Sequence, residues 1–175
     1  MRFSHLHVHT YFSFGIGASS PEALVAAAVV RGIHSLACTD TNGVYGAVEF
    51  QKAAESLGVR PILGAHLSWN GQETVALAAD ERGWAALCRA ITAIHWGKGA
   101  TLAGIVAQDR EGLILLSQDI GFLENVLQLS GPRDLYAELV PGRQRHAVLA
   151  AARRLGLAPV ATNAVVAANA EDWTR

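Results

Sequence analysis

Apolar and polar positions along this chain follow two alternating patterns, one typical of strands and one of helices. Short apolar runs, typical of strands, alternate with longer segments whose apolar residues have helical spacing. The runs predicted as strands are Phe3–Val8, Ser35–Thr39, Val59–Ala65, the hairpin pair Leu67–Trp69 and Thr74–Ala79, Gly112–Leu116, Leu135–Leu139 and Val160–Thr162. The segments predicted as helices are Pro21–Arg31, Val44–Leu57, Glu81–Ile94, Leu102–Ala107, Phe122–Leu129 and Gly142–Leu155.

Several of these boundaries carry local chemical signals. Ser20-Pro21-Glu22 gives a capping hydroxyl, a proline at the first helical position and an acid in the first turn. Asn70-Gly71 is a strong two-residue hairpin signal, and Asp80 is placed to cap the helix that follows.

The alternation of about seven strand-like runs with helices predicts an α/β fold of parallel strands and helical crossovers. Two architectures fit, an open doubly wound sheet and a closed barrel related to the TIM barrel. The glycine-rich fingerprints of nucleotide-binding open sheets are absent. Polar residues instead follow the strand ends, which in a barrel would meet at one mouth: His7, His9, Asp40, His66, Asp119 and Asn163.

Composition narrows the class of protein. With 175 residues, 51% hydrophobic and 17% charged, the chain is expected to be one globular domain, residues 1–175. A net charge of −1 gives no general attraction to nucleic acid. Cys38 and Cys88 lie in apolar runs and indicate buried thiols in a reducing compartment. Because no signal peptide or membrane-length apolar run is present, we expect a cytoplasmic protein without membrane contact.

Three histidines stand at alternate positions near the start of the chain. In a strand, His5, His7 and His9 share one face, and neutral imidazole is the commonest metal ligand in proteins. A single histidine is more often an ordinary core or surface residue. The closely spaced pair His7 and His9 at a strand end favours metal binding, whereas His5 is expected to be structural.

Two motifs resemble the PHP (polymerase and histidinol phosphatase) family. The first is Leu6-His7-Val8-His9-Thr10, with Ser13 just beyond. The second runs from Leu36 to Phe50 and includes Thr39-Asp40-Thr41 and Tyr45-Gly46-Ala47-Val48-Glu49-Phe50. This last string is similar to the branch found in the alpha subunit of bacterial DNA polymerase III and its error-prone relatives. Later segments also match, and the resemblance spans nearly the whole chain.

The resemblance implies a distorted (β/α)7 TIM-like barrel. Active members of the family hold three metal ions, usually zinc, iron or manganese, and hydrolyse phosphoesters. In some replicative polymerases the domain resembles a proofreading 3′→5′ exonuclease, and in others it has lost its metals and serves as a scaffold. There it is the N-terminal module of a much larger polymerase, so the present chain is expected to be such a module or a standalone copy.

Against this family pattern, several ligand positions have changed. Side chains that cannot bind metal, or bind it poorly, stand at four of them: Ile16, Thr41, Ala164 and Val166. Three others carry a different donor: His66 replaces the bridging glutamate, and Glu73 and Asp119 align with a histidine and with a cysteine or histidine. Neutral His66 cannot offset several divalent charges, so a hydrolytic three-metal centre is not expected.

Two states of the site remain open. One zinc or manganese ion could be held by His7, His9, His66 and Asp119, a plausible tetrahedral set. The alternative is an empty polar pocket without metal. Further candidates for its lining or for supporting the ligands are His5, Asp40, Thr41, Glu73 and Asn163.

Three functions follow. The first is a catalytically degenerate PHP domain that supports a DNA polymerase, in cis or in trans, in replication or translesion synthesis, with only indirect contact to DNA. The second is a metal-dependent phosphoesterase or 3′→5′ exonuclease with a rebuilt site. The third is a binding module unrelated to a polymerase. If more polypeptide follows residue 175, the parent protein is expected to be a DNA-directed DNA polymerase.

Overall fold

The computed structural model describes residues 3–169 and 172, which its internal contacts divide into two compact units. The first unit joins the chain up to Ala65 with the segment from Asn163 onward, and the second runs from His66 to Thr162. Strand β2 (Arg60–Trp69) passes from one unit into the other.

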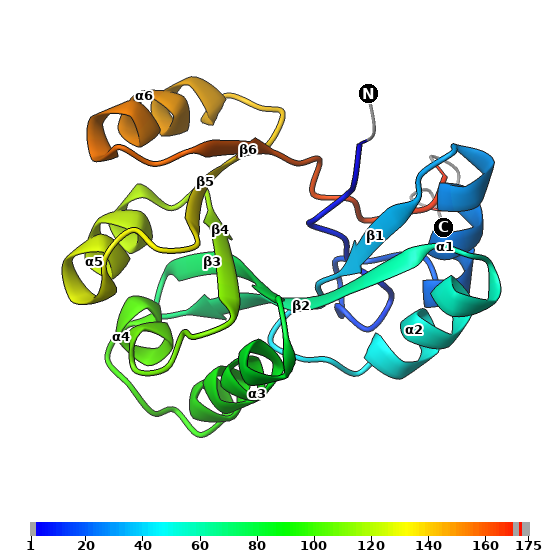
Figure 1. Cartoon of the computed structure of the whole chain (residues 1–175), viewed down its shortest axis with the longest axis horizontal. Coiled ribbons are helices and arrows are strands. Elements are labelled where there is room, and N and C mark those ends of the chain that lie inside the picture. Colours follow the sequence, from blue (N-terminus) through cyan, green and yellow to red (C-terminus); the bar gives the residue numbers. More distant parts are fainter. Residues whose placement is uncertain (1–2, 170–171, 173–175) are drawn as a thin grey trace. The chain divides into compact units, whose positions relative to one another are not determined.

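In the first unit, helix α1 (Pro21–Val30) begins where the sequence predicts, because the Ser20 hydroxyl accepts a hydrogen bond from the Ala23 amide. Strand β1 (Ser35–Cys38) pairs in parallel with the first half of β2, from Ser35 with Arg60 to Cys38 with Leu63. Helix α2 (Ala47–Ser56) connects these two strands and contacts α1 (Figure 1).

The strand predicted over Phe3–Val8 is wrong as a continuous element. Only two isolated parallel bridges form, His5 with Leu36 and Val8 with Val165. The hydroxyl of Thr39 accepts from the Val8 amide at 2.8 Å and donates to the Val8 carbonyl at 3.0 Å. The Val8 amide is therefore taken by a side chain, while the Val8 carbonyl still also accepts from the Thr39 backbone amide at 2.9 Å. The segment then changes partner from β1 to Val165.

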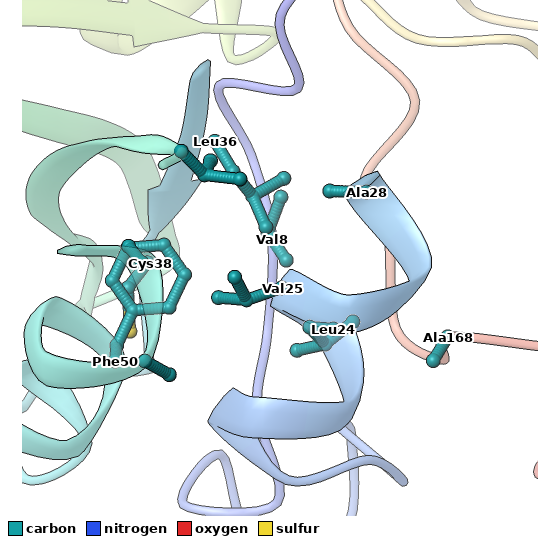
Figure 2. Close-up of a cluster of buried hydrophobic side chains, with 11 residues drawn as sticks. Val8, Leu24, Val25, Ala28, Leu36, Cys38, Phe50 and Ala168 are labelled. Carbon is teal, nitrogen blue, oxygen red and sulfur yellow. The ribbon is translucent and has the colours of Figure 1, made fainter. Parts of the chain in front are cut away.

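A cluster of buried apolar residues lies at the core of the first unit (Figure 2). Val8 and Val25 are fully buried, and Phe50 of α2 closes the cluster against Cys38 of β1. The cluster brings together both helices of this unit, β1, the N-terminal segment and Ala168 near the end of the described chain. Burial of this surface fixes the N-terminal segment that carries the histidines.

The second unit contains the rest of β2 and eight further elements (Figure 1). In chain order these are β3 (Gln72–Ala78), α3 (Glu81–His95), α4 (Leu102–Ala107), β4 (Leu113–Ser117), α5 (Ile120–Ser130), β5 (Leu135–Leu139), α6 (Arg145–Leu155) and β6 (Pro159–Ala161). Hydrogen bonds link its strands in the order β2-β3-β4-β5-β6. Phe122 of α5 is fully buried within it.

Strand direction departs from the expected all-parallel arrangement. β4, β5 and β6 are parallel neighbours, but β3 and β4 are antiparallel. The reason is the Asn70-Gly71 turn, where both residues have positive φ (47° and 78°) and reverse the chain into β3. Within residues 3–169 and 172 there are six strands, so the mixed α/β class is confirmed and a closed seven-stranded barrel is not.

The length and composition of the helices decide whether any of them could span a membrane. Across the part of the chain that the structure describes, no helix combines the length and apolar character that crossing a bilayer requires.

Candidate metal centre

His7 and His9 form a buried pair in the first unit. Their side chains are close in space, with the two Nε2 atoms 3.0 Å apart and the ring centroids 5.0 Å apart. The residues are only 5% and 3% exposed. The prediction that His5, His7 and His9 share one face holds for His7 and His9 only, and the backbone that carries them forms bridges and not a full strand.

The spacing of this pair fits one metal ion. Two nitrogen ligands at about 2.0–2.1 Å from a tetrahedral zinc lie roughly 3.3 Å apart. The observed 3.0 Å also fits a hydrogen bond between the rings. A small rotation of the two imidazole rings would therefore convert the hydrogen-bonded pair into a pair that chelates an ion.

Ser13 and Asp40 lie directly behind His9. The Ser13 hydroxyl oxygen is 2.8 Å from His9 Nδ1 and donates to Asp40 Oδ1 at 2.7 Å. Asp40 is 1% exposed and also accepts from the amide and hydroxyl of Thr10 at 2.8 and 2.9 Å. Asp40 thus orients its neighbours and does not cap α2, whose N-cap is Gly46.

The thiol of Cys38 also faces Asp40, with Sγ 3.5 Å from Oδ2. Burial, and secondarily the charge of Asp40, raise the pKa of this thiol far above its usual range. Thiolate is the form of cysteine that binds metal or attacks an electrophile. Cys38 is therefore a packing residue and a weak hydrogen-bond donor.

Near the histidines, the family ligand positions that carry no good metal donor contribute hydrogen bonds through their backbone or that of a neighbouring residue. The Thr41 amide donates to Ser13 Oγ at 3.0 Å, while its own hydroxyl is buried without a hydrogen-bond partner. Around Ala164 and Val166 the chain runs beside the histidines through Val165, whose carbonyl accepts from the His9 amide at 2.8 Å. Asn163 is exposed.

His5 lies in different surroundings from the pair. It lines a cavity of about 190 Å³ together with residues of α1 and the Ala167–Ala168 segment, and its Nδ1 has no hydrogen-bond partner. Desolvation, and secondarily the charge of Arg31, lower the pKa of His5 below its ordinary value of 6.5. The structural role expected for His5 stays a prediction.

In the second unit, His66 lies in β2 and pairs with Glu73 across the hairpin, with Nε2 and Oε2 3.5 Å apart. Glu73 and Asp119 line a hollow of about 510 Å³ together with Gln118 and Gln144. Asp119 also has a structural task, because it is the N-cap of α5 and accepts from the Phe122 amide at 3.0 Å. The three candidate donors of this unit thus lie near one another.

The sequence assigned no role to two polar residues that the structure buries, Ser13 and Glu138. Ser13 was visible as the polar residue beyond the histidine motif, but its contact with His9 could not be deduced. Glu138 of β5 is 2% exposed, and its Oε1 accepts from the Thr162 hydroxyl at 2.5 Å. The signal for Glu138 is a lone charge inside an apolar strand, since such a charge needs a partner when buried.

The family model for the PHP domain matches residues 5–156. The chain belongs to the PHP family. It is 40% identical over 166 residues to an error-prone DNA polymerase of Symbiobacterium thermophilum, a match covering 87% of this chain and 15% of that protein. An error-prone DNA polymerase of Anaeromyxobacter sp. is 35% identical over 153 residues, covering 84% and 13%. This PHP chain thus spans about a seventh of the length of these polymerases.

Solved structures support the PHP fold. A putative metal-dependent phosphoesterase from Bifidobacterium adolescentis superposes with a TM-score of 0.63 at 16% identity, covering 94% of this chain and 87% of that one. A two-domain protein from Bacteroides vulgatus, described as containing a predicted PHP-like metal-dependent phosphoesterase, gives 0.67 at 13% identity, covering 97% and 53%. At these identities the likeness concerns the fold.

Proposed function

We propose that this PHP domain has lost phosphoester hydrolysis and supports an error-prone type of DNA polymerase, in cis or in trans. The observation that carries the proposal is that only some of the family's metal-ligand positions still hold a side chain that can bind metal. His7 and His9 keep a buried, chelating geometry, yet the neighbouring segment around Val165 and the Thr41 position supply backbone groups and no further ligand. The relatives are polymerases, which supports the choice of partner.

We further propose that the domain holds one zinc or manganese ion at most. His7 and His9 would be two of its ligands, with His66 as a third and Asp119 as the fourth. His66 suits this role by its chemistry, because its imidazole in β2 is a donor that zinc accepts. An ion bound there would supply positive charge and fix the ligand-bearing segments.

The charge balance argues against a cluster of ions. Metal clusters that hydrolyse phosphoesters use several ions to stabilise the attacking and leaving oxygens. Divalent ions held close together repel one another strongly unless carboxylates bridge them. His66 is neutral when it acts as a ligand, and Ala164 and Val166 offer no donor atom. The remaining donors therefore match a single ion.

Hydrolysis is the direct test. The wild-type chain, loaded with Mn²⁺ or Zn²⁺, is expected to cleave bis(p-nitrophenyl) phosphate no faster than the His7→Ala, His9→Ala double variant. Elemental analysis of the same preparation should give no more than one ion per chain. A phosphoesterase of this fold with a complete ligand set, assayed in parallel, controls for the conditions.

A rebuilt phosphoesterase or exonuclease site is the second candidate. Its support is that Glu73 and Asp119 line one hollow and that Glu73 pairs with His66. Metal-dependent cleavage that the double variant loses would establish this second function and refute the first. Three ions per chain would refute the proposal of one ion at most.

Association with a polymerase can be tested separately. The Symbiobacterium thermophilum polymerase, with the segment that matches this chain deleted, is a suitable partner. We expect the purified chain to bind this truncated enzyme in a sedimentation-velocity titration and not to bind primed DNA alone, because the chain carries a net charge of −1. The intact polymerase, whose own domain occupies the surface, serves as the control. Binding to DNA but not to the truncated enzyme would contradict the supporting role.

A further inference from the structure

Ser13 and Asp40 surround the Nδ1 side of His9 with a defined set of hydrogen bonds. We infer that these two residues are positioning residues that hold the His9 proton on Nδ1, so that Nε2 presents its lone pair toward His7. The relevance of this tautomer to an ion rests on the proposed function, but the tautomer itself does not.

The direction of each hydrogen bond follows from counting donors and acceptors at Ser13. A hydroxyl has one hydrogen and two lone pairs. The Thr41 amide can only donate, and it uses one lone pair at 3.0 Å. The Asp40 carboxylate can only accept, so it takes the hydroxyl hydrogen at 2.7 Å. His9 Nδ1, at 2.8 Å, is left with the second lone pair and must therefore donate.

Asp40 is fixed in the accepting state by its other neighbours. Its Oδ1 receives the Thr10 amide as well as Ser13, and its Oδ2 receives the Thr10 hydroxyl and the Cys38 thiol. The Thr10 hydroxyl is itself directed, since it accepts from the Phe12 amide at 3.1 Å while donating to Asp40. Every hydrogen around this carboxylate thus points toward it.

Gly46, at the start of α2, packs closely against the Asp40 carboxylate. A Cβ added to Gly46 would lie 2.8 Å from a ring carbon of Phe12 and 3.0 Å from Asp40 Oδ2. Only glycine allows the backbone to pack this closely against the carboxylate. The Gly46 position in the motif Tyr45-Gly46 is therefore tied to the placement of Asp40 and, through Ser13, to His9.

The consequence for ligation concerns the ring nitrogen on the far side. A neutral imidazole with its proton on Nδ1 has a bare Nε2, which is the nitrogen that faces His7 at 3.0 Å. Metal-binding histidines commonly donate their other ring N–H to an acceptor, and losing that acceptor typically lowers metal affinity about 10- to 100-fold. Ser13 is such an acceptor, and Asp40 sets its polarity.

The test uses the tautomer as its first readout. In the metal-free, ¹⁵N-labelled chain, two-bond ¹H–¹⁵N correlation spectra at a pH where His9 is neutral are expected to show its proton on Nδ1. Ser13→Ala should abolish this preference and lower Zn²⁺ affinity about 10- to 100-fold in a chelator-competition titration. Ser13→Thr keeps the hydroxyl and is expected to retain the wild-type tautomer.

Ser19→Ala is the matched control. Ser19 is another buried serine of the same unit, and its hydroxyl likewise donates to a carboxylate, that of Asp172, and accepts from a backbone amide, that of Ala168. Its removal should leave the His9 tautomer and the Zn²⁺ affinity unchanged. If wild-type His9 carries its proton on Nε2, or if Ser13→Ala behaves like Ser19→Ala, the inference is refuted. Failure of the wild type to bind Zn²⁺ with the expected tautomer present would instead refute the ion proposed above.

Discussion

Phe50→Ala is expected to lower the free energy of unfolding by about 3–5 kcal/mol, as removal of a large buried aromatic side chain typically does. Phe50 is fully buried in the cluster that joins α2 to β1 and the N-terminal segment (Figure 2). The loss combines the burial free energy of the ring with the cavity that it leaves. Urea denaturation followed by circular dichroism measures the change.

Val48→Ala is the control for this prediction, since Val48 lies on the same helix but is 63% exposed. Its change in unfolding free energy should stay within about 0.5 kcal/mol. Equal effects of the two substitutions would contradict the packing of α2 described above.

His9→Ala is expected to weaken Zn²⁺ binding by more than about 100-fold, because it removes one of the proposed ligands and not merely a supporting residue. His7→Ala should have a similar effect, since the two Nε2 atoms lie 3.0 Å apart and would share the ion. Binding is measured by competition with a chelator of known affinity. The double variant should bind no more weakly than either single variant once the site is lost.

His34→Ala provides the matched control for these variants. His34 belongs to the same unit but is exposed and lies apart from the pair in sequence, just before β1. Its substitution should leave Zn²⁺ affinity unchanged. If His34→Ala and His9→Ala bind equally well, the buried pair is not an ion site and the pocket is a purely polar one.

Much of the fold follows from local sequence signals. The capping serine and proline at the start of α1, the Asn70-Gly71 turn and the helix over Leu102–Ala107 all appear where the sequence predicts them. Each depends on residues close to one another in the chain, whose conformational preferences act without distant partners. Strand β5 over Leu135–Leu139 is likewise as predicted.

Two departures arise where distant residues decide the outcome, and a third is local. The Asn70-Gly71 turn reverses the direction of β3, but the sequence pattern does not specify that β3 then pairs with β4. The Phe3–Val8 segment has strand character, but the Thr39 hydroxyl replaces part of its ladder. Helix α2 begins at Ala47, later than the predicted Val44, and Gly43 lies against the Tyr45 ring, where a Cβ would come within 2.5 Å.

At the site, too, local features could be predicted from the sequence and contacts between distant residues could not. The spacing of His7 and His9 predicts a pair, and the structure contains one. The link from His9 through Ser13 to Asp40 spans residues far apart in the chain, so sequence reasoning could place Asp40 near the site without identifying what it holds. That Asp119 and His66 join the pair stays a prediction.

Val8 bridges to Val165, so the first unit is completed by residues from both ends of the described chain. During synthesis on a ribosome, the histidine-bearing segment emerges well before Val165, its bridging partner. The unit from His66 to Thr162 can therefore acquire its native contacts while the first unit still waits for residue 165. The core surface of the first unit, including Phe50, would meanwhile be open to chaperones.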